Sequence, residues 1–202
     1  MKRQYLFSIA IALFVCASAS AQDRASVFGN VRFGESPERV AQAMSESGLK
    51  PYYPAKIDMR FPLDQTFTGM LLGEKALVMA LYSDTRGLEK MIVTFLTDDE
   101  NALPFYKQFK GQLTDRFGAT AADVERYDFP YDDGSHVGRE QTAIRTGRGH
   151  VGATWDWADT GDKAGLISLS IEKSLTIYLT YESAKWAMEA GRRATLSGPA
   201  SQ

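Results

Sequence analysis

The sequence predicts one α+β domain, in which an antiparallel sheet of six to eight strands carries two main helices on one face and is followed by a C-terminal helix. Short apolar runs joined by connections of two to five residues are typical of hairpins and meanders. Two longer segments repeat their apolar residues at helical spacing, and each precedes a group of such runs. The pattern therefore favours antiparallel over parallel pairing.

The first 21 residues have the pattern of a secretory signal peptide. Lys2 and Arg3 form a short positive segment, an apolar run extends from Tyr5 to Val15, and Ala19-Ser20-Ala21 has the small-x-small form that signal peptidase cleaves. The run is shorter than the roughly 20 residues that span a bilayer, so a membrane anchor is the less favoured alternative. We expect a periplasmic or secreted protein whose mature chain begins at Gln22 without a transmembrane segment.

Cysteine content and charge narrow the class of protein. In bacterial lipoproteins a small residue directly precedes the lipidated cysteine. Cys16 follows Val15, which fits that pattern poorly. Residues 22–202 contain no cysteine, which excludes a disulfide framework, a cysteine nucleophile and a thiolate metal site. Without Lys2 and Arg3, 21 of the 23 basic residues remain against 25 acidic ones, a formal charge of −4. This mild acidity disfavours nucleic acid as a partner.

The first half is predicted as strand, helix and meander. Ser36 is an N-cap residue, Pro37 suits the first helical position and Gly48 is a C-terminal stop, so a helix is expected between them. A short strand at 31–33 precedes this helix, and the proline-rich segment 50–62 is expected to be an extended crossing. Three strands should then form the meander, at 66–72, 76–82 and 88–97.

The second half is predicted to repeat this order. A helix is expected at 104–117, with the acidic residues 98–100 outside it, because proline is disfavoured in a helix interior. The stretch 120–138 is polar and turn-rich. Four strands follow, at 139–146, 149–158, 164–172 and 175–182, the last two joined by Lys173-Ser174 as a two-residue loop. A helix at 183–194 completes the domain, which spans 22–194, and a disordered tail is expected at 195–202.

The two halves, 31–97 and 104–182, are compatible with a diverged tandem β-α-βββ duplication. The segment Phe33-Gly34-Glu35-Ser36-Pro37-Glu38-Arg39-Val40, with its helix ending at Gly48-Leu49, resembles the opening of small envelope modules. Similar helix-then-meander units occur in the assembly lipoprotein BamE and, in tandem, in the β-lactamase inhibitor protein. The resemblance implies a binding module without catalytic residues. The chain departs from BamE in its lack of a lipid-anchor cysteine and from the inhibitor in its lack of disulfides, so no functional residue is carried over.

The segment Gly147-Arg148-Gly149-His150-Val151-Gly152 matches the G-x-G-x-x-G fingerprint of dinucleotide-binding proteins letter for letter. That fingerprint works only between a strand and a helix whose N-terminus receives the pyrophosphate. Here a strand-like alternation follows, so we interpret the glycines as part of a hairpin and expect no cofactor. Trp155 and Trp157 share one face of this strand and are expected in the core.

Acidic residues and one histidine gather in the loop before that segment: Asp128, Asp132, Asp133, His136 and Glu140. Such a loop could hold calcium or zinc, but its spacing fits neither an EF-hand nor H-E-x-x-H, and a solvated turn explains the same residues. The only histidines are His136 and His150, and no G-x-S-x-G elbow accompanies them. We therefore predict neither a metal site nor catalytic residues, although paired carboxylates remain an open alternative.

The last hairpin and the first meander differ in their second faces. The last hairpin alternates apolar residues with a hydroxyl-rich set that we predict to be a recognition surface: Ser168, Ser170, Thr176, Tyr178 and Thr180. In the first meander both faces are apolar, with Leu77 and Met79 opposite Val78 and Ala80. The C-terminal helix, segment 51–62, a ligand or a partner must cover that second apolar face.

The function that these patterns favour is non-catalytic. We expect an exported binding or interaction protein of the cell envelope that uses an open sheet face to bind an unknown protein or small ligand. The alternative is a small hydrolase or a lipid- or small-molecule-binding protein with a site between the sheet and the loop 119–141. An apolar cavity with convergent charged side chains would favour the alternative, and a broad, shallow polar face would favour the binding protein.

Overall fold

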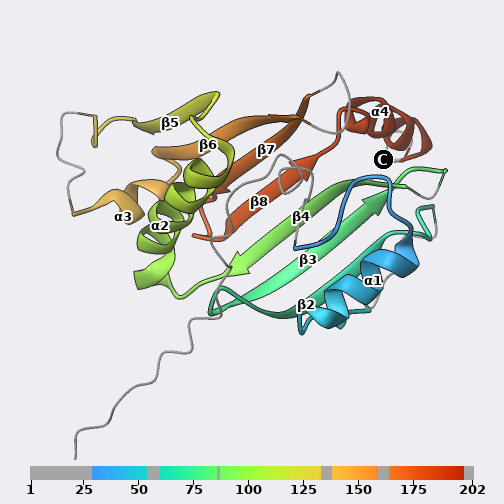
Figure 1. Cartoon of the computed structure of the whole chain (residues 1–202). Coiled ribbons are helices and arrows are strands. Elements are labelled where there is room, and N and C mark those ends of the chain that lie inside the picture. Colours follow the sequence, from blue (N-terminus) through green and yellow to red (C-terminus); the bar gives the residue numbers. More distant parts are fainter. Residues whose placement is uncertain (1–28, 54–59, 86, 133–137, 159–163, 198–202) are drawn as a thin grey trace, which may run out of the picture.

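The computed structural model describes residues 29–53, 60–85, 87–132, 138–158 and 164–197. Within them, eight antiparallel strands form one open sheet in the order β1-β2-β3-β4-β8-β7-β6-β5 (Figure 1). The predicted α+β class with one antiparallel sheet is confirmed, at the upper end of the predicted strand number. The signal peptide predicted at 1–21 lies outside the described residues.

The strands are β1 (Lys50–Pro51), β2 (Gln65–Leu71), β3 (Glu74–Tyr82), β4 (Leu88–Leu96), β5 (Ala122–Tyr127), β6 (Gly149–Ala158), β7 (Ala164–Ile171) and β8 (Ile177–Glu182). The helices are α1 (Pro37–Glu46), α2 (Asp99–Phe117), α3 (Glu140–Arg145) and α4 (Trp186–Ser197). The halves meet where β4 pairs with β8, so α1 with β1–β4 lies on one side of this pairing and α2 with β5–β8 on the other. Figure 1 shows α1 and α2 in front of the sheet; α1 contacts β1 and β2, and α2 contacts β6 and β7.

Helix α1 forms as its end signals predict. The Ser36 side chain accepts a hydrogen bond from the Arg39 amide (3.4 Å), and Pro37 occupies the first turn. At the other end Gly48 has a φ of 80°, and the Leu49 amide donates to the Met44 carbonyl oxygen (2.9 Å). This left-handed C-cap suits glycine, which lacks the Cβ that disfavours the conformation.

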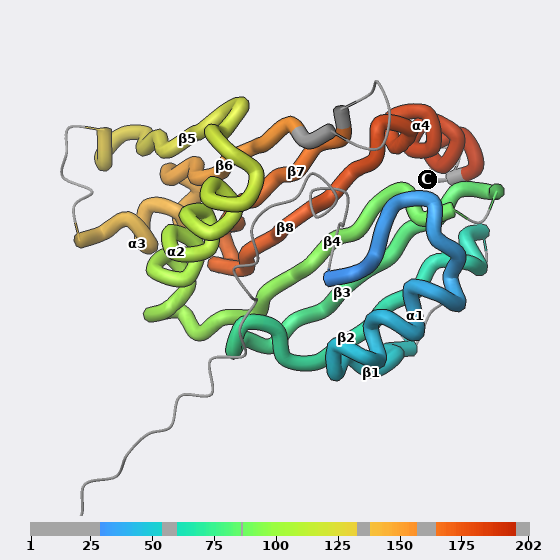
Figure 2. Tube along the Cα trace, viewed as in Figure 1, coloured from blue at the N-terminus to red at the C-terminus, as the bar shows by residue number. Residues whose placement is uncertain are grey.

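The predicted strand at 31–33 is wrong. Residues 29–36 instead cross the sheet on the side of α1 and α2 (Figure 2), and Val31 is fully buried there. The Gly34 amide donates to the Leu88 carbonyl oxygen (2.9 Å), and the Leu88 amide donates to that of Glu35 (3.0 Å). This segment therefore covers the sheet and contributes apolar side chains to the core. The alternation of apolar and polar residues alone did not distinguish such a segment from a strand.

Helix α2 begins five residues earlier than predicted, and Pro104 lies inside it. A proline at this position cannot donate to the Glu100 carbonyl oxygen, one turn earlier. That oxygen instead accepts the Gln141 side-chain amide (3.4 Å), and Arg145 forms an ion pair with Asp99. Contacts from α3 thus replace the hydrogen bond that Pro104 cannot make in the first turns of α2. The prediction that residues 98–100 lie outside the helix is therefore wrong for 99 and 100.

Two further predictions in the second half are wrong. Residues 139–146 form the short helix α3 rather than a strand, with Ala143 and Ile144 buried on one side. Within the stretch predicted as irregular, 122–127 form the edge strand β5. The strand was not predicted because its side chains are charged. An edge strand exposes such residues at little cost, and their charge discourages pairing with other chains.

The hairpin loops also differ from the predicted ones. The connection between β2 and β3 is a two-residue turn, in which Leu72 and Gly73 have φ values of 53° and 86°. Between β7 and β8 the loop is longer than Lys173-Ser174, because the Glu172 amide bonds the Thr176 carbonyl oxygen (3.0 Å) around Leu175 at a φ of 59°. Leucine is unusual in this region, and at 1% exposure Leu175 stabilises the turn by burying its side chain.

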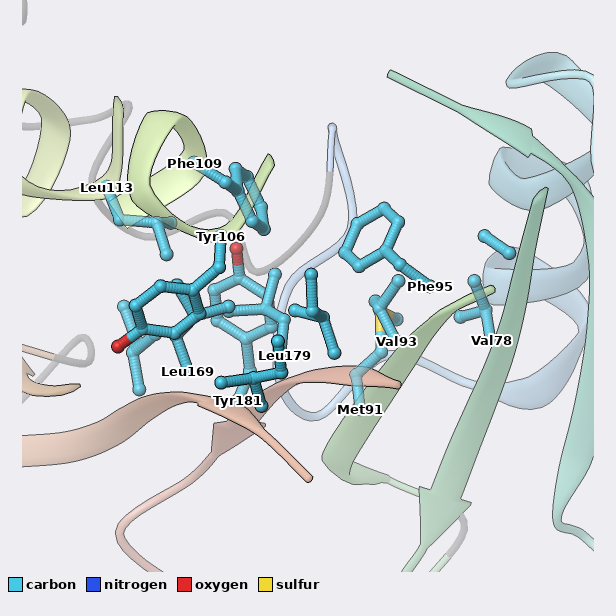
Figure 3. Close-up of a cluster of buried hydrophobic side chains, with 14 of the residues drawn as sticks. Val78, Met91, Val93, Phe95, Tyr106, Phe109, Leu113, Leu169, Leu179 and Tyr181 are labelled. Atoms are coloured by element: carbon cyan, nitrogen blue, oxygen red, sulfur yellow. The ribbon is translucent and has the colours of Figure 1, made fainter. Parts of the chain in front are cut away.

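One continuous core covers the face of the sheet that lies toward α1 and α2, here called the buried face. The four residues predicted to share a cluster, Phe95, Phe109, Leu169 and Ile177, all belong to it. Figure 3 shows Phe109 from α2 beside Phe95 from β4; their ring centroids are 5.4 Å apart. Trp155 is fully buried as predicted, whereas the side chain of Trp157 lies outside the described part of the structure.

Helix α4 follows β8 at one end of the sheet (Figure 1), and polar contacts hold it there. Arg193 donates to both carboxylate oxygens of Asp64 (2.7 and 2.8 Å), to Glu189 (3.0 Å) and to the Tyr82 carbonyl oxygen (2.6 Å). Its guanidinium also stacks 4.3 Å from the centroid of the Phe61 ring. The helix continues to Ser197, three residues into the predicted tail.

Candidate functional site

The second face of the sheet, here called the open face, carries side chains that are only partly buried. They lie in rows across the strands, since paired residues point to the same side. One row comprises Leu77, Thr94, Tyr178, Ser170, Gly152 and Val124, and the next comprises Met79, Ile92, Thr180, Ser168, Thr154 and Ala122. None of these twelve residues is charged, so the centre of the open face is neutral.

Four of the five residues of the predicted recognition surface lie side by side on the open face. Tyr178 pairs with Ser170 in one row and Thr180 with Ser168 in the next, and all four are half-buried. Thr176 lies in the connecting turn, where its hydroxyl oxygen accepts a hydrogen bond from Ser174 (2.9 Å). The strand register therefore places the predicted residues together, while their role in binding stays a prediction.

The apolar second face of the first meander is covered at one end only. Leu81 is 9% exposed near α4, where Trp186 lies against Lys90, 4.9 Å from the ring centroid to Nζ. Away from α4, Leu77, Met79 and Ile92 are half-buried, and Met70 and Leu96 are 56% and 54% exposed. Of the four predicted covers for this face, the C-terminal helix lies over one end. Elsewhere, among the described residues, an apolar patch remains accessible beside the hydroxyl-bearing strands.

A groove of about 300 Å³ continues the Tyr178 row toward the sheet edge. Gly152 has no side chain, so the row has a gap between Ser170 and Val124. The groove is lined by Val124, Gly147, Gly149, His150, Val151, Gly152, Ser170, Ile171, Glu172 and Lys173. This groove lies over β6, between Val124 of β5 and Ser170 of β7, and therefore adjoins the predicted recognition surface.

Each glycine of the G-x-G-x-x-G segment has a structural role. Gly147 ends α3 with a φ of 72°, and the Arg148 amide donates to the Ala143 carbonyl oxygen (2.8 Å). A Cβ on Gly149 would lie 2.9 Å from the Ile144 amide nitrogen, so only glycine permits this approach. Gly152 forms the floor of the groove. Because the helix precedes the glycines, its C-terminus lies here, and the fingerprint lacks the helix N-terminus that receives a pyrophosphate.

The His150 side chain bonds Asp128, with 2.9 Å between Nε2 and Oδ2. This hydrogen bond, together with Arg126 at 3.3 Å, holds the pKa of the Asp128 carboxyl below its usual value. Of the acidic loop that resembled a metal site, Asp133 and His136 lie outside the described residues. In the part that is described, no three His, Cys, Asp or Glu side chains lie close enough to hold a metal ion.

The chain matches no protein-family model, no curated protein and no solved structure in three separate comparisons. None of the helices in the described segments combines the length and apolar character that a membrane crossing requires.

The groove was missed by reasoning from the sequence. Its lining comes from β5, from the start of β6 and from the β7–β8 turn, which are up to 49 residues apart in the chain. A usable signal existed in Gly152, which interrupts an otherwise regular alternation between Val151 and Ala153. A glycine within a strand often marks a place where another group approaches the backbone.

Proposed function

We propose that the protein is exported and acts as a non-catalytic binding protein of the cell envelope that engages its partner through the open face. The observation that carries this proposal is the neutral pair of residue rows across the sheet, half apolar and half hydroxyl-bearing. A broad face of this kind suits a protein surface better than a small molecule, which favours an enclosed cavity.

Tyr178 is the central residue of this proposal. It lies half-buried between Thr94 and Ser170, its partners on the two neighbouring strands. Tyrosine is enriched among residues that dominate interface energies, because it offers a large contact area and a hydroxyl with little loss of side-chain freedom. The adjacent patch around Leu77, Met79 and Ile92 supplies apolar area.

The mirrored element order of the two halves supports an origin by tandem duplication, with both main helices on the buried face. The seam would be the antiparallel pair β4–β8. Superposing 37–96 on 99–182 tests this idea: β2–β4 should match β6–β8 in direction and spacing, and a mismatch in either would contradict it.

The binding proposal is tested with the protein as bait in an envelope extract, followed by mass spectrometry of proteins and small molecules. The double variant Tyr178→Ala, Thr180→Ala should retain its fold and weaken association severalfold, because it removes the proposed anchor residue of the interface. The control is Gln108→Ala, Gln112→Ala on exposed positions of α2. Equal capture by the parent and both variants would rule out the open face.

A second candidate is a small-molecule or hydrolytic site in the groove, to which the 119–141 segment contributes Val124. It is supported by Ser170 and His150 in one groove, with Asp128 bonded to His150. However, no hydrogen bond joins Ser170 to His150 among the described residues, and Ser170 lies within a strand rather than at a turn that would expose a nucleophile. A serine-reactive phosphonate that labels the parent but not Ser170→Ala would favour this candidate.

A further inference from the structure

Two hydrogen-bond donors in the groove lack an acceptor. The Lys173 ammonium and the Ser170 hydroxyl both line it, and neither has a hydrogen bond or ion pair in the portion of the chain that the structure describes. Donors with no acceptor beside a concave surface are available to a ligand, and a charged acceptor satisfies an ammonium best.

The Lys173 side chain lies against the turn before β6. It lies across Gly147, so that Nζ is 2.6 Å from the position a Cβ on Gly147 would take. Because Gly147 has no Cβ, the aliphatic part of the lysine side chain can lie against the backbone there. Its charge lies beside the groove.

The other charged groups at the groove leave Lys173 as the available cation. Asp128 is already bonded to His150 and lies 3.3 Å from Arg126, so its negative charge is matched by these partners. The remaining anion is Glu172, which is exposed and forms no ion pair with any described residue. An acidic group in the groove is therefore attracted by Lys173 and repelled by Glu172.

The apolar part of the groove limits what this ligand can be. Gly152 forms the floor and Val124 one wall, and both offer contact to a short carbon chain. At about 300 Å³ the groove is at the lower limit of ligand pockets, which run from about 300 to 1,000 Å³. It suits a side chain better than a cofactor.

We propose that the groove is the specificity pocket of the open face and receives an acidic side chain of the partner protein. The carboxylate accepts hydrogen bonds from Lys173 and Ser170, while its methylene groups lie on Gly152 and against Val124. This inference rests on the proposed function, because the groove continues the row that contains Tyr178.

The test is an NMR titration of the isotope-labelled protein with two blocked tripeptides, acetyl-Ala-Glu-Ala-amide and its Gln counterpart, and with free propionate. The Glu peptide should cause saturable shifts at the amides of 147–152 and 170–173. The Gln peptide should bind about tenfold more weakly, the usual effect of losing a charge-assisted hydrogen bond. Propionate should also bind more weakly, whereas a site for free acids would bind it at least as tightly as the Glu peptide.

Three variants and a control sharpen the test. Lys173→Met keeps the stem over Gly147 without the charge and should weaken the Glu peptide about tenfold. Gly152→Val should fold, because a Cβ at this position would lie 3.4 Å from its nearest neighbour, the Leu169 carbonyl oxygen. It should block binding, because the added methyl groups fill the groove. Glu172→Gln should bind equally or more tightly. Gln108→Ala, on an exposed position of α2 and not part of the groove lining, should behave as the parent.

The proposal is overturned if no peptide gives saturable shifts, if the Gln peptide binds as well as the Glu peptide, or if Lys173→Met and Gly152→Val both bind as the parent does. Weaker binding by Glu172→Gln would also overturn it, because the ligand would then carry a positive group. If the Glu peptide gives no saturable shifts but Tyr178→Ala, Thr180→Ala captures less partner, the acidic pocket is refuted and the proposed binding function stands. Intact peptide binding with unchanged capture by that double variant refutes the proposed use of the Tyr178 surface.

Discussion

At the scale of single residues, Phe109 joins α2 to the sheet. It is 8% exposed, and its ring centroid lies 5.4 Å from that of Phe95 and 5.8 Å from that of Phe105. Phe109→Ala should cost about 3–5 kcal/mol of unfolding free energy, measured by urea denaturation, because it leaves a cavity in a packed cluster. Gln108→Ala on the adjacent exposed position should change it by less than about 0.5 kcal/mol. A loss below about 1 kcal/mol for Phe109→Ala would contradict the packing.

Two glycines in the same strand should respond oppositely to alanine. A Cβ on Gly149 would lie 2.9 Å from the Ile144 amide nitrogen, whereas one on Gly152 would lie 3.4 Å from its nearest neighbour. Gly149→Ala should therefore destabilise the fold by about 1–3 kcal/mol through overpacking. Gly152→Ala should be neutral or stabilise it by up to about 1 kcal/mol. Thermal unfolding of both variants decides the matter, and similar melting curves would refute the close approach of α3.

At the scale of elements, the attachment of α4 depends on one arginine. Arg193 bonds Asp64, Glu189 and the Tyr82 carbonyl oxygen, and its side chain is 13% exposed against 35% for Arg192. Arg193→Met should cost about 3 kcal/mol, because it leaves Asp64 without its arginine partner and removes one of the two arginines that bond Glu189. Arg192→Met should cost about 1 kcal/mol or less. Denaturation combined with hydrogen exchange of the α4 amides measures both, and equal losses would mean that Arg193 has no special role.

The stability of α4 should depend on pH, because Glu189 accepts hydrogen bonds from two arginines of the same helix. The hydrogen bond from Arg192, followed by that from Arg193, lowers the pKa of the Glu189 carboxyl, which is 5% exposed. The ionised form therefore stabilises the fold above about pH 4.3, the usual value in an unfolded chain, and this contribution is lost as the pH falls through the lower pKa of the folded state.

Glu189→Gln cannot titrate. It should be less stable than the parent at neutral pH, and its melting temperature should change less between about pH 5 and pH 3. Asp128→Asn is the control, because the pKa of Asp128 is also lowered but its side chain is exposed and screened by solvent. Parallel pH curves for the parent and Glu189→Gln would show that the ionised Glu189 carboxylate does not stabilise the fold.

At the scale of the whole molecule, the prediction concerns export. If Ala19-Ser20-Ala21 is cleaved, the protein recovered from the producing cell begins at Gln22. Mass analysis of the intact protein and of its N-terminal peptide measures this directly. Retention of residues 1–21, or a lipid on Cys16, would refute the predicted cleavage.

Local chemistry explains the parts of the fold that were predicted. Helix α1 has a capping residue, a proline and a stop glycine within 13 residues, and the β2–β4 meander has short connections between strongly apolar runs. These signals act between residues that are close in the chain, so they are legible without tertiary structure. The cluster of Phe95, Phe109, Leu169 and Ile177 followed from the same periodicities.

The failures share a different cause. Helix α2 includes Pro104 because Gln141 supplies a donor to the Glu100 carbonyl oxygen from another helix. Strand β5 exists because β6 offers it a pairing edge, although its own residues are charged and exposed. In each case a distant contact outweighed a local preference.

The sequence by itself determined the α+β class, the antiparallel pairing and the face on which the hydroxyl residues of β7 and β8 lie, because strand alternation and capping are local properties. Only the tertiary structure decided that β4 pairs with β8 and that Gly152 opens a groove beside Ser170. It also decided that Lys173 lies across Gly147. These features join segments far apart in the chain, and such contacts depend on which packing buries the most apolar surface while satisfying the backbone, which no local pattern specifies.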